Sequence, residues 1–242
     1  MRKLIIGDIH GMYDKMLEAL ECASYDPEKD ELYSVGDLCD RGSNPVEVID
    51  YIYSLPNCHL ILGNHDLFLL EYLSGNISDD SYKVWTRYNG GVPTVEKIEK
   101  QPEAWKRKVC NRLLHTPFAT MAGDYIVVHG GISDIAQDWP IASYVDITPE
   151  ETCVGTLGYE DYAMELTWER DSIKAALRDK EHSPCNIDNR VFVGHTVLKS
   201  FKPFITDDRK FIDIDTGSYL DEGAVTVMDM DSLEYWQSGT VH

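Results

Sequence analysis

The sequence predicts an α/β fold, and two patterns carry this prediction. Up to residue 62, short apolar runs alternate with segments of helical periodicity, so strand, helix and strand repeat. From residue 190 onward, short apolar runs separated by turn residues indicate strands joined without helices. The first pattern predicts a parallel sheet with right-handed crossovers. We therefore expect a parallel-rich first half, an antiparallel second half, and a single domain over 1–242.

The expected elements follow the chain in order. Pro45 suits the first position of a helix, with Asn44 as its N-cap. Gly75 would end the next helix, expected at 66–73. Residues 76–115 break the rhythm and indicate a helical insertion over the strand ends, whereas 132–165 form a long acidic excursion with little periodicity. Helices are expected at 12–23, from 45 onward, at 66–73 and at 172–178. Strands are expected at 2–7, 31–35, 60–62, 117–121, 125–128, 190–193, 202–206, 211–214, 224–230 and 233–237.

Composition and charge limit the class of protein. The chain has 242 residues, of which 43% are hydrophobic, enough for a substantial core. It has no apolar run of ~18 residues, so we expect no membrane span. The N-terminus lacks the regions of a signal peptide, and the six cysteines include no CxxC pair. We therefore expect a cytoplasmic monomer with reduced thiols and, at a net charge of −20, no nucleic-acid partner.

One turn organises the chain, the segment GDLCDRG at 36–42. It places Asp37, Asp40 and Arg41 after an expected strand and before an expected helix, which is where open α/β sheets bind ligands. Four further strand ends deliver polar side chains in the same way. Together these ends provide six candidate metal ligands: Asp8, His10, Asp37, Asn64, His129 and His195.

The ligand types indicate the chemistry. Oxygen and imidazole donors suit Mn, Fe, Zn or a similar divalent ion, and the absence of cysteine ligands argues against a structural zinc site. Six protein ligands exceed what one ion needs beside its waters, so two ions that share a bridging carboxylate fit the count better. Two-metal sites stabilise in-line displacement at phosphorus. Arg41 and Arg170 could then bind phosphate oxygens as bidentate forks, while His65 could act as a general acid oriented by Asp40.

The motifs GDIHG, GDLCDRG, GNHD, HGG and GHT, in this order, resemble the phosphoprotein phosphatase family of metallophosphoesterases. The resemblance extends from Gly7 to about Gly217, and a Trp-Glu-Arg segment at 168–170 together with Asp-Thr-Gly at 215–217 is most similar to its bacterial and phage branch. That branch includes the lambda-phage-type protein phosphatase and the symmetrical diadenosine tetraphosphate hydrolases. The chain departs from the eukaryotic members in having Asp66 where they have Glu, and their C-terminal active-site tyrosine has no evident counterpart.

The resemblance implies a four-layer fold, a central β-sandwich flanked by helices. It implies that Asp8, His10 and Asp37 hold one metal ion, and that Asp37 bridges to a second. Hydrolysis would proceed by direct attack of a hydroxide bridging the two ions, without a phosphoenzyme. The second ion would be held by Asp37, Asn64, His129 and His195, with Asp40 and His65 as the acid pair and Arg41 and Arg170 on the phosphate.

The substrate remains open between two classes. Residues 83–112 hold eight Lys or Arg against three Glu, and residues 132–171 hold ten acids against one Arg. Because the net charge of −20 repels a highly charged dinucleotide, we expect phosphoserine or phosphothreonine in proteins as the substrate. The alternative is diadenosine tetraphosphate or a related dinucleoside polyphosphate, with Trp85, Tyr88 or Trp105 stacking on adenine. A scaffold that has lost catalysis is disfavoured because no ligand is missing. Cys39 is either a packing residue or an oxidisable thiol.

Overall fold

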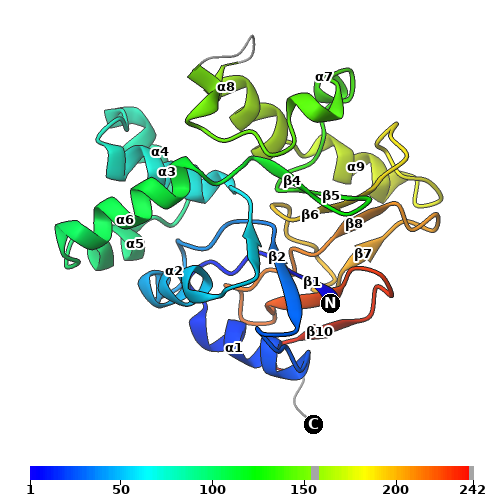
Figure 1. Ribbon diagram of the computed structural model, residues 1–242, viewed down its shortest axis with the longest axis horizontal. Coiled ribbons are helices and arrows are strands. Elements are labelled where there is room, and N and C mark those ends of the chain that lie inside the picture. The colour runs from blue at the N-terminus through cyan, green and yellow to red at the C-terminus, as the bar shows by residue number, and fades with distance from the viewer. Residues whose placement is uncertain (154–157, 240–242) are drawn as a thin grey trace.

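Two sheets form the centre of the protein, as seen in a computed structural model that describes residues 1–153 and 158–239 (Figure 1). In the first sheet, β1, β2 and β3 pair in parallel, and β9 and β10 extend it antiparallel at the β1 edge. This is the parallel arrangement expected for the first half of the chain. Its strands, in sheet order, are β10 (Tyr235–Gln237), β9 (Thr226–Asp229), β1 (Arg2–Ile6), β2 (Asp30–Ser34) and β3 (Cys58–Leu60).

The second sheet differs from the expectation of an antiparallel second half. Its three central strands, β5, β6 and β8, are parallel, and only the edge strands β4 and β7 run antiparallel to their neighbours. A long connection with helices of its own joins β5 to β6, and such a connection permits parallel pairing. The strands, in sheet order, are β4 (Ala119–Ala122), β5 (Tyr125–Val128), β6 (Arg190–Val193), β8 (Phe211–Asp213) and β7 (Phe204–Ile205).

The sheets pack face to face, as side-chain alternation along the strands shows. Ile5, Phe192 and Ile212 belong to one fully buried cluster that lies between the two sheets. Leu4 and Ile6, the neighbours of Ile5, point the other way into the larger core under the helices. Because successive side chains of a strand point to opposite faces, each sheet contributes to both cores. The result is the expected sandwich flanked by helices.

The helices cover the outer faces in three groups (Figure 1). In the first group, one helix follows each of the first three strands: α1 (Tyr13–Cys22), α2 (Pro45–Ser54) and α3 (Asn64–Ser74). The insertion supplies α4 (Asp79–Tyr88), α5 (Val92–Ile98) and α6 (Glu103–Leu114). The connection between β5 and β6 supplies α7 (Asp134–Gln137), η1 (Ile141–Ser143), η2 (Glu151–Cys153), α8 (Tyr159–Tyr162), η3 (Ala163–Thr167) and α9 (Asp171–Arg178).

Two helix boundaries matter for the site. Helix α3 begins at Asn64, two residues before the predicted start, because the Asp66 carboxylate accepts a hydrogen bond from the backbone N–H of Gly63. Asn64 and His65 therefore lie on the first helical turn. The helix ends at Gly75, which has a left-handed φ of 74°, as expected. Within the described residues, no helix has the length and apolar character needed to cross a membrane.

The segment 132–165 was expected to lack periodicity, and the structure explains why. Its helices are of three to five residues, too short to show an apolar period. Local caps start two of them: the Ser133 hydroxyl accepts a hydrogen bond from the Ala136 N–H at the start of α7, and the Asp161 carboxylate accepts one from the Gly158 N–H at the start of α8. Buried Tyr144 and Tyr162 tie the segment to the core.

Candidate active site

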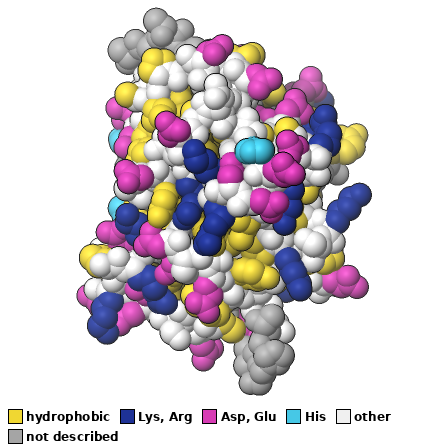
Figure 2. Space-filling view, turned by 90° about the vertical axis from the view of Figure 1, so that its right-hand side faces the viewer, with side chains coloured by type: hydrophobic (Ala, Val, Ile, Leu, Met, Phe, Trp, Pro, Cys, Tyr) yellow, Lys and Arg dark blue, Asp and Glu magenta, His cyan; other side chains and the backbone are white. Residues whose placement is uncertain are grey.

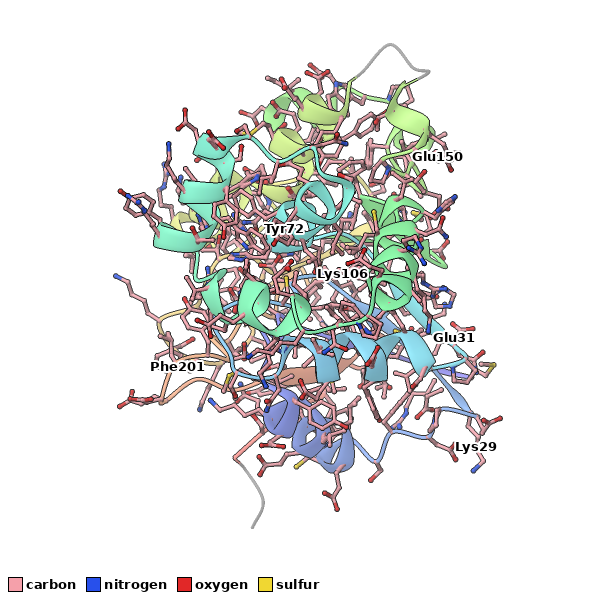
Figure 3. The ribbon with its side chains drawn as sticks, turned by 90° about the vertical axis from the view of Figure 1, so that its left-hand side faces the viewer. Lys29, Glu31, Tyr72, Lys106, Glu150 and Phe201 are labelled. Atoms are coloured by element: carbon pink, nitrogen blue, oxygen red, sulfur yellow. The ribbon has the colours of Figure 1, made fainter. Side chains whose placement is uncertain are left out.

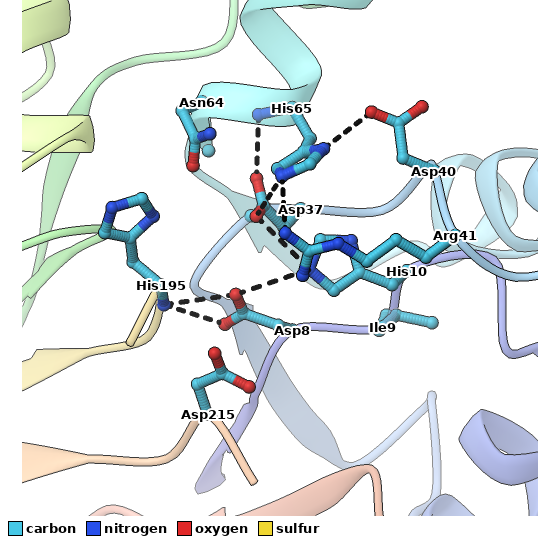
Figure 4. Close-up of polar contacts among 12 residues, drawn as sticks. Asp8, Ile9, His10, Asp37, Asp40, Arg41, Asn64, His65, His195 and Asp215 are labelled. Atoms are coloured by element: carbon cyan, nitrogen blue, oxygen red, sulfur yellow. Dashed lines mark hydrogen bonds and ion pairs between the residues drawn. The ribbon is translucent and has the colours of Figure 1, made fainter. Parts of the chain in front are cut away.

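Six predicted ligands from both sheets meet at the carboxyl ends of the strands (Figure 4). All six are nearly inaccessible to solvent: Asp8, His10, Asp37, Asn64, His129 and His195. Ligand atoms approach within 4.8 Å of one another in two groups, one with His10, Asp37 and His65, the other with Asp37, His129 and His195. Asp37 is the member common to both groups.

The backbone of the site is unusual. Among non-glycine residues of the described chain, ten have a positive φ, and five of these are site residues. Left-handed backbone costs about 1–3 kcal/mol for such residues and is concentrated where function requires it. Here it turns each side chain sharply out of its strand into the same space. The five residues, with φ between 49° and 72°, are His10, Asp37, Asp40, Arg41 and His195.

Asp37 is the most tightly held residue of the site. Its Oδ1 accepts a hydrogen bond of 3.0 Å from the backbone N–H of His65. A Cβ on Gly63 would collide with this carboxylate, so glycine is required there. Burial opposes ionisation of Asp37, but the charges of His129 and His65 outweigh it and lower the pKa well below its usual value. Asp37 is therefore an ionised carboxylate at the centre of the site.

Asp66, the departure from the eukaryotic motif, has a structural role. Its carboxylate accepts hydrogen bonds from the backbone N–H groups of Asp37 at 2.7 Å, Leu38 at 3.1 Å and Gly63 at 3.0 Å. Burial and then the charge of Asp37 raise its pKa to about 7. The shorter side chain thus anchors the loop that carries Asp37 rather than entering the site.

His10 and His129 each present one ring nitrogen, Nε2, to the site. His10 Nδ1 lies 2.9 Å from the carbonyl oxygen of Cys39, and His129 Nδ1 lies 2.6 Å from that of Val35. Because a carbonyl only accepts, both Nδ1 atoms carry the proton and donate. Their Nε2 atoms face Asp37 Oδ2 at 3.5 Å and 3.4 Å. Such fixed tautomers are typical of metal-binding histidines.

The donor set fits divalent cations. Asn64 Oδ1 lies 3.1 Å from His129 Nε2, and buried His195 Nε2 has no hydrogen-bond partner among the described residues. Burial, followed by the charge of His129, lowers the pKa of His195 to about 2, so its ring is neutral and can act as a ligand. Acceptor atoms that converge without donors between them are stabilised by a cation.

Asp8 lies on the side of the site nearest the second sheet. Its two oxygens lie 3.3 and 3.1 Å from the backbone nitrogen of His195, which donates to them, and Oδ2 lies 4.0 Å from His10 Nε2. Gly194 is needed here because a Cβ would collide with the Asp8 carboxylate. Burial, and then the charges of Asp215 and Asp37, raise the pKa of Asp8 well above its usual value. A cation at Asp8 would relieve this repulsion.

His65 and Asp40 form a buried pair, and the helical insertion supports it. Asp40 Oδ2 accepts from His65 Nδ1 at 2.6 Å and from the indole N–H of Trp85 at 2.6 Å. The Asp40 N–H donates to Thr94 Oγ1 at 2.9 Å. Trp85 was considered for adenine stacking, which is wrong, because it is fully buried. Sequence reasoning missed Trp85 and Thr94 as supports of the site, since no motif marks them.

The Arg41 side chain lies across His10 and His65 (Figure 4). Its Nη1 donates to His10 Nε2 at 2.7 Å, and its Nη2 donates to His65 Nε2 at 3.1 Å. The guanidinium stacks over the ring of Tyr219, 4.2 Å from the centroid. Tyr219 also contacts the His10 ring edge to face at 5.3 Å. The structure therefore places a tyrosine in the site that the sequence did not identify.

Arg170 reaches the site from the N-terminus of α9. Its Nη1 donates to the carbonyl oxygen of His195 at 3.3 Å and to Thr196 Oγ1 at 3.0 Å. The neighbouring Trp168 ring packs edge to face against His195 and Phe68, with ring centroids 5.8 Å and 5.9 Å apart. Arg170 and Trp168 also line a cavity of about 580 Å³ between α7 and α9, to which none of the six candidate ligands contributes.

Cys39 is a packing residue. It is fully buried, and its thiol donates to the carbonyl oxygen of His65 at 3.6 Å. Burial, followed by the charge of Asp40, raises its pKa well above the usual value. A thiol that stays protonated is a poor target for oxidants, so the redox hypothesis for Cys39 is not supported. The five cysteines with described side chains are all free.

Sequence comparisons identify relatives of known type. The family model described as calcineurin-like phosphoesterase matches residues 1–210. A curated relative from Dechloromonas aromatica, named symmetrical bis(5'-nucleosyl)-tetraphosphatase, is 34% identical over 133 residues, which are 54% of this chain and 44% of the relative. The chain thus spans less than half the length of this relative.

Solved structures share the fold. One titled putative diadenosine tetraphosphatase superposes with a TM-score of 0.62 at 18% identity, covering 98% of this chain and 92% of the other. A protein serine/threonine phosphatase from Saccharomyces cerevisiae gives a TM-score of 0.60 at 19% identity, covering 95% and 73%. At this identity the likeness concerns the fold alone. The match of the family model over residues 1–210, most of the sequence, shows that the chain belongs to the calcineurin-like phosphoesterase family.

Proposed function

We propose that this enzyme is a dinuclear metal-dependent hydrolase of dinucleoside polyphosphates, which cleaves diadenosine tetraphosphate or a related compound symmetrically. The observation that carries the proposal is that buried ligand side chains, grouped around Asp37, converge next to Arg41 at one end and Arg170 at the other, which suits a phosphate ester or anhydride. Relatives named symmetrical tetraphosphatases support the dinucleotide over the phosphoprotein that the charge of the sequence favoured.

The two ions would be held in the arrangement that the motifs imply. Asp8, His10 and Asp37 would bind one ion, and Asp37 would be shared with a second ion at Asn64, His129 and His195. When bound, the two ions, for which Mn²⁺ is our proposal, supply charge stabilisation and an activated water for displacement at phosphorus. The ionised state of Asp37 supports its role as the shared ligand.

The remaining side chains would act on the substrate. Arg41 and Arg170 would bind non-bridging phosphate oxygens in bidentate fashion, and Tyr219 would fix the plane of Arg41 by stacking. His65 would give a proton from Nε2 to the leaving oxygen once Arg41 has turned from Nε2 to the phosphate, because the His65 Nδ1 is committed to Asp40. Asp40 would hold the His65 ring in the orientation that this transfer needs.

The surroundings of the site offer room for more than one phosphate group. The cavity of about 580 Å³ beside Arg170 is lined by Trp168 and Arg178, but also by Asp134, Glu165 and Asp171, so it offers space for a nucleoside while its charge is mixed. The overall charge of −20 is not a uniformly negative surface, since Lys and Arg side chains lie among the Asp and Glu side chains on the face shown in Figure 2. Global charge therefore argues less strongly against a dinucleotide than the sequence suggested.

A second candidate function is dephosphorylation of phosphoserine or phosphothreonine in proteins. The observation in its favour is the complete Asp40–Arg41 pair next to His65, the fuller protein-phosphatase form of the motif. The two candidates share the same site and the same metal ligands. They differ only in what lies beyond the phosphate.

The test compares kcat/KM for diadenosine tetraphosphate with that for a phosphothreonine peptide, under the same Mn²⁺ and salt. We expect the dinucleotide to be preferred by more than tenfold, or about 1.4 kcal/mol of barrier. A tenfold preference for the peptide would reverse the assignment. Asp37→Asn is the control for both substrates, because loss of less than about tenfold would show that the activity does not arise from this site.

A further inference from the structure

A further carboxylate, that of Asp215, faces the metal ligands. Asp215 lies two residues after β8, is fully buried, and its carboxylate points toward Asp8 and His195 in the close-up (Figure 4). None of the roles proposed above uses it. Its backbone is held in place, because the Leu198 N–H donates to the Asp215 carbonyl oxygen at 3.0 Å.

One oxygen of Asp215 lacks a donor. Oδ1 accepts a hydrogen bond of 3.0 Å from the Gly217 N–H, whereas buried Oδ2 has no hydrogen-bond partner among the described residues. The facing Asp8 carboxylate accepts hydrogen bonds from the backbone N–H of His195. Among the described residues, no hydrogen bond joins the Asp8 carboxylate to Asp215 Oδ2, which lies on the neighbouring side of the same site in Figure 4.

Buried carboxylates in this arrangement require a cation or the proton of a water to satisfy them. The two proposed ion positions are unequal, since one has three protein ligands and the other has four. The ion with fewer protein ligands is the one beside Asp8. In Figure 4, Asp215 lies on the far side of Asp8 from His10 and Asp37, which favours an outer position.

We propose that Asp215 is a positioning residue of the metal centre, whose Oδ2 accepts a hydrogen bond from a water that completes the shell of the ion at Asp8, His10 and Asp37. This inference rests on the proposed two-metal function and deepens it. Outer-shell partners of this kind typically change metal affinity by about 10–100-fold. Asp215 would thus make the ion at Asp8 bind more tightly without affecting the other ion directly.

The test is equilibrium Mn²⁺ binding to the apo protein, followed by electron paramagnetic resonance of free and bound Mn²⁺. For the wild type we expect two ions per chain and a spin-coupled spectrum. For Asp215→Asn we expect one ion to retain its affinity, the other to bind about 10–100-fold more weakly, and the coupled signal to be lost at equimolar loading. Asp215→Glu should restore part of the affinity.

Asp213→Asn is the matched control. Asp213 is the last residue of β8, is equally buried, and has an Oδ2 without a hydrogen-bond partner among the described residues, while its Oδ1 accepts from the Asp215 N–H at 2.9 Å. We expect this variant to bind both ions with affinities within about threefold of the wild type, a range of less than one decade. Thermal unfolding of each apo variant separates a loss of metal from a loss of fold.

Two results would overturn the inference. One is an Asp215→Asn protein that binds both ions with wild-type affinity. The other is an equal loss of affinity in the Asp213→Asn and Asp215→Asn proteins, which would indicate a general effect of buried charge. A wild type that binds two ions but does not hydrolyse dinucleotides would instead refute the proposed substrate and leave the role of Asp215 standing.

Discussion

The two segments beside the active site, the insertion 76–115 and the connection 132–171, contact it in different ways. The insertion carries the excess of basic residues, yet it reaches the site through uncharged residues. Trp85 and Thr94 bind Asp40, and the Gly90 carbonyl oxygen accepts from the Arg41 N–H at 2.9 Å. Its Lys106 Nζ lies 3.4 Å from Glu99 Oε1, the oxygen that also accepts from the Tyr72 hydroxyl, and Tyr72 and Lys106 are labelled close together in Figure 3.

The connection, residues 132–171, has the opposite composition to the insertion and contributes a charged side chain to the site. It is strongly acidic, but it reaches the site through Trp168 and through Arg170, its one basic residue. Its Glu169 is buried and accepts from the N–H groups of Asp171 and Ser172. The charge summed over a segment therefore does not predict what the substrate meets. The individual side chains that face the site do.

The largest expected effect concerns His65, which the insertion holds through Asp40. His65→Asn should lower kcat by about 10²–10⁴-fold for a substrate with a poor leaving group, such as a phosphoserine peptide. An aryl phosphate with an acidic phenol needs little proton transfer and should lose much less. Measuring kcat for both substrates decides the point. Equal losses would indicate a structural role and break the link between the insertion and catalysis.

The next effect tests the insertion directly. Trp85→Phe keeps the buried ring but removes the indole N–H that donates to Asp40. Hydrogen bonds to charged groups are worth about 1.5–3 kcal/mol, so we expect kcat to fall roughly tenfold or more while KM changes little. Tyr88→Phe is the control, since Tyr88 lies on the same helix and is 81% exposed. Wild-type kcat in Trp85→Phe would remove the insertion from the mechanism.

A smaller effect is expected from the basic surface. Reversing the charges of Lys106, Arg107 and Lys108 should lower kcat/KM for diadenosine tetraphosphate only about twofold, through weaker long-range steering. At high salt the difference should vanish, because the Debye length falls to about 3 Å at 1 M. A loss above tenfold that persists in salt would mean that these side chains touch the substrate.

The smallest effects are opposite responses to pH in the two segments. Burial raises the pKa of Glu169 above its value in the unfolded chain. The resulting stabilisation of the fold is fully present at pH values below the unfolded pKa and is lost as pH rises through the folded pKa. The Tyr72 hydrogen bond lowers the pKa of Glu99, so its contribution is present above the unfolded value and is lost as pH falls through the folded pKa.

Two substitutions measure this difference. Glu169→Gln should raise the melting temperature at pH 8 by roughly 2–4 °C, the equivalent of about 1 kcal/mol, and leave it unchanged at pH 3.5. Glu99→Gln should lower the melting temperature slightly at pH 8 and also leave it unchanged at low pH. If both variants shift in the same direction at pH 8, the contrast between a buried and an exposed carboxylate is wrong.

The sequence was sufficient to predict which polar side chains meet, because each candidate ligand follows closely after an apolar strand, so local spacing places its side chain. It was insufficient where tertiary contacts bring residues together. Trp85 reaches Asp40 from a helix of the insertion, and Tyr219 and Asp215 follow strands whose positions depend on the sheet order. The parallel pairing of β5, β6 and β8 was missed for the same reason, because short strands carry no local signal of their direction.

The most direct test of the proposed function is the product pattern from diadenosine tetraphosphate. Purified wild-type protein with Mn²⁺ should convert the substrate to ADP alone, with one oxygen from labelled water incorporated per substrate cleaved. The reaction should stop on chelation and be absent in Asp37→Asn. Formation of ATP and AMP would contradict symmetrical cleavage. Absence of any turnover, with rapid release of phosphate from a phosphothreonine peptide under the same conditions, would contradict the dinucleotide assignment altogether.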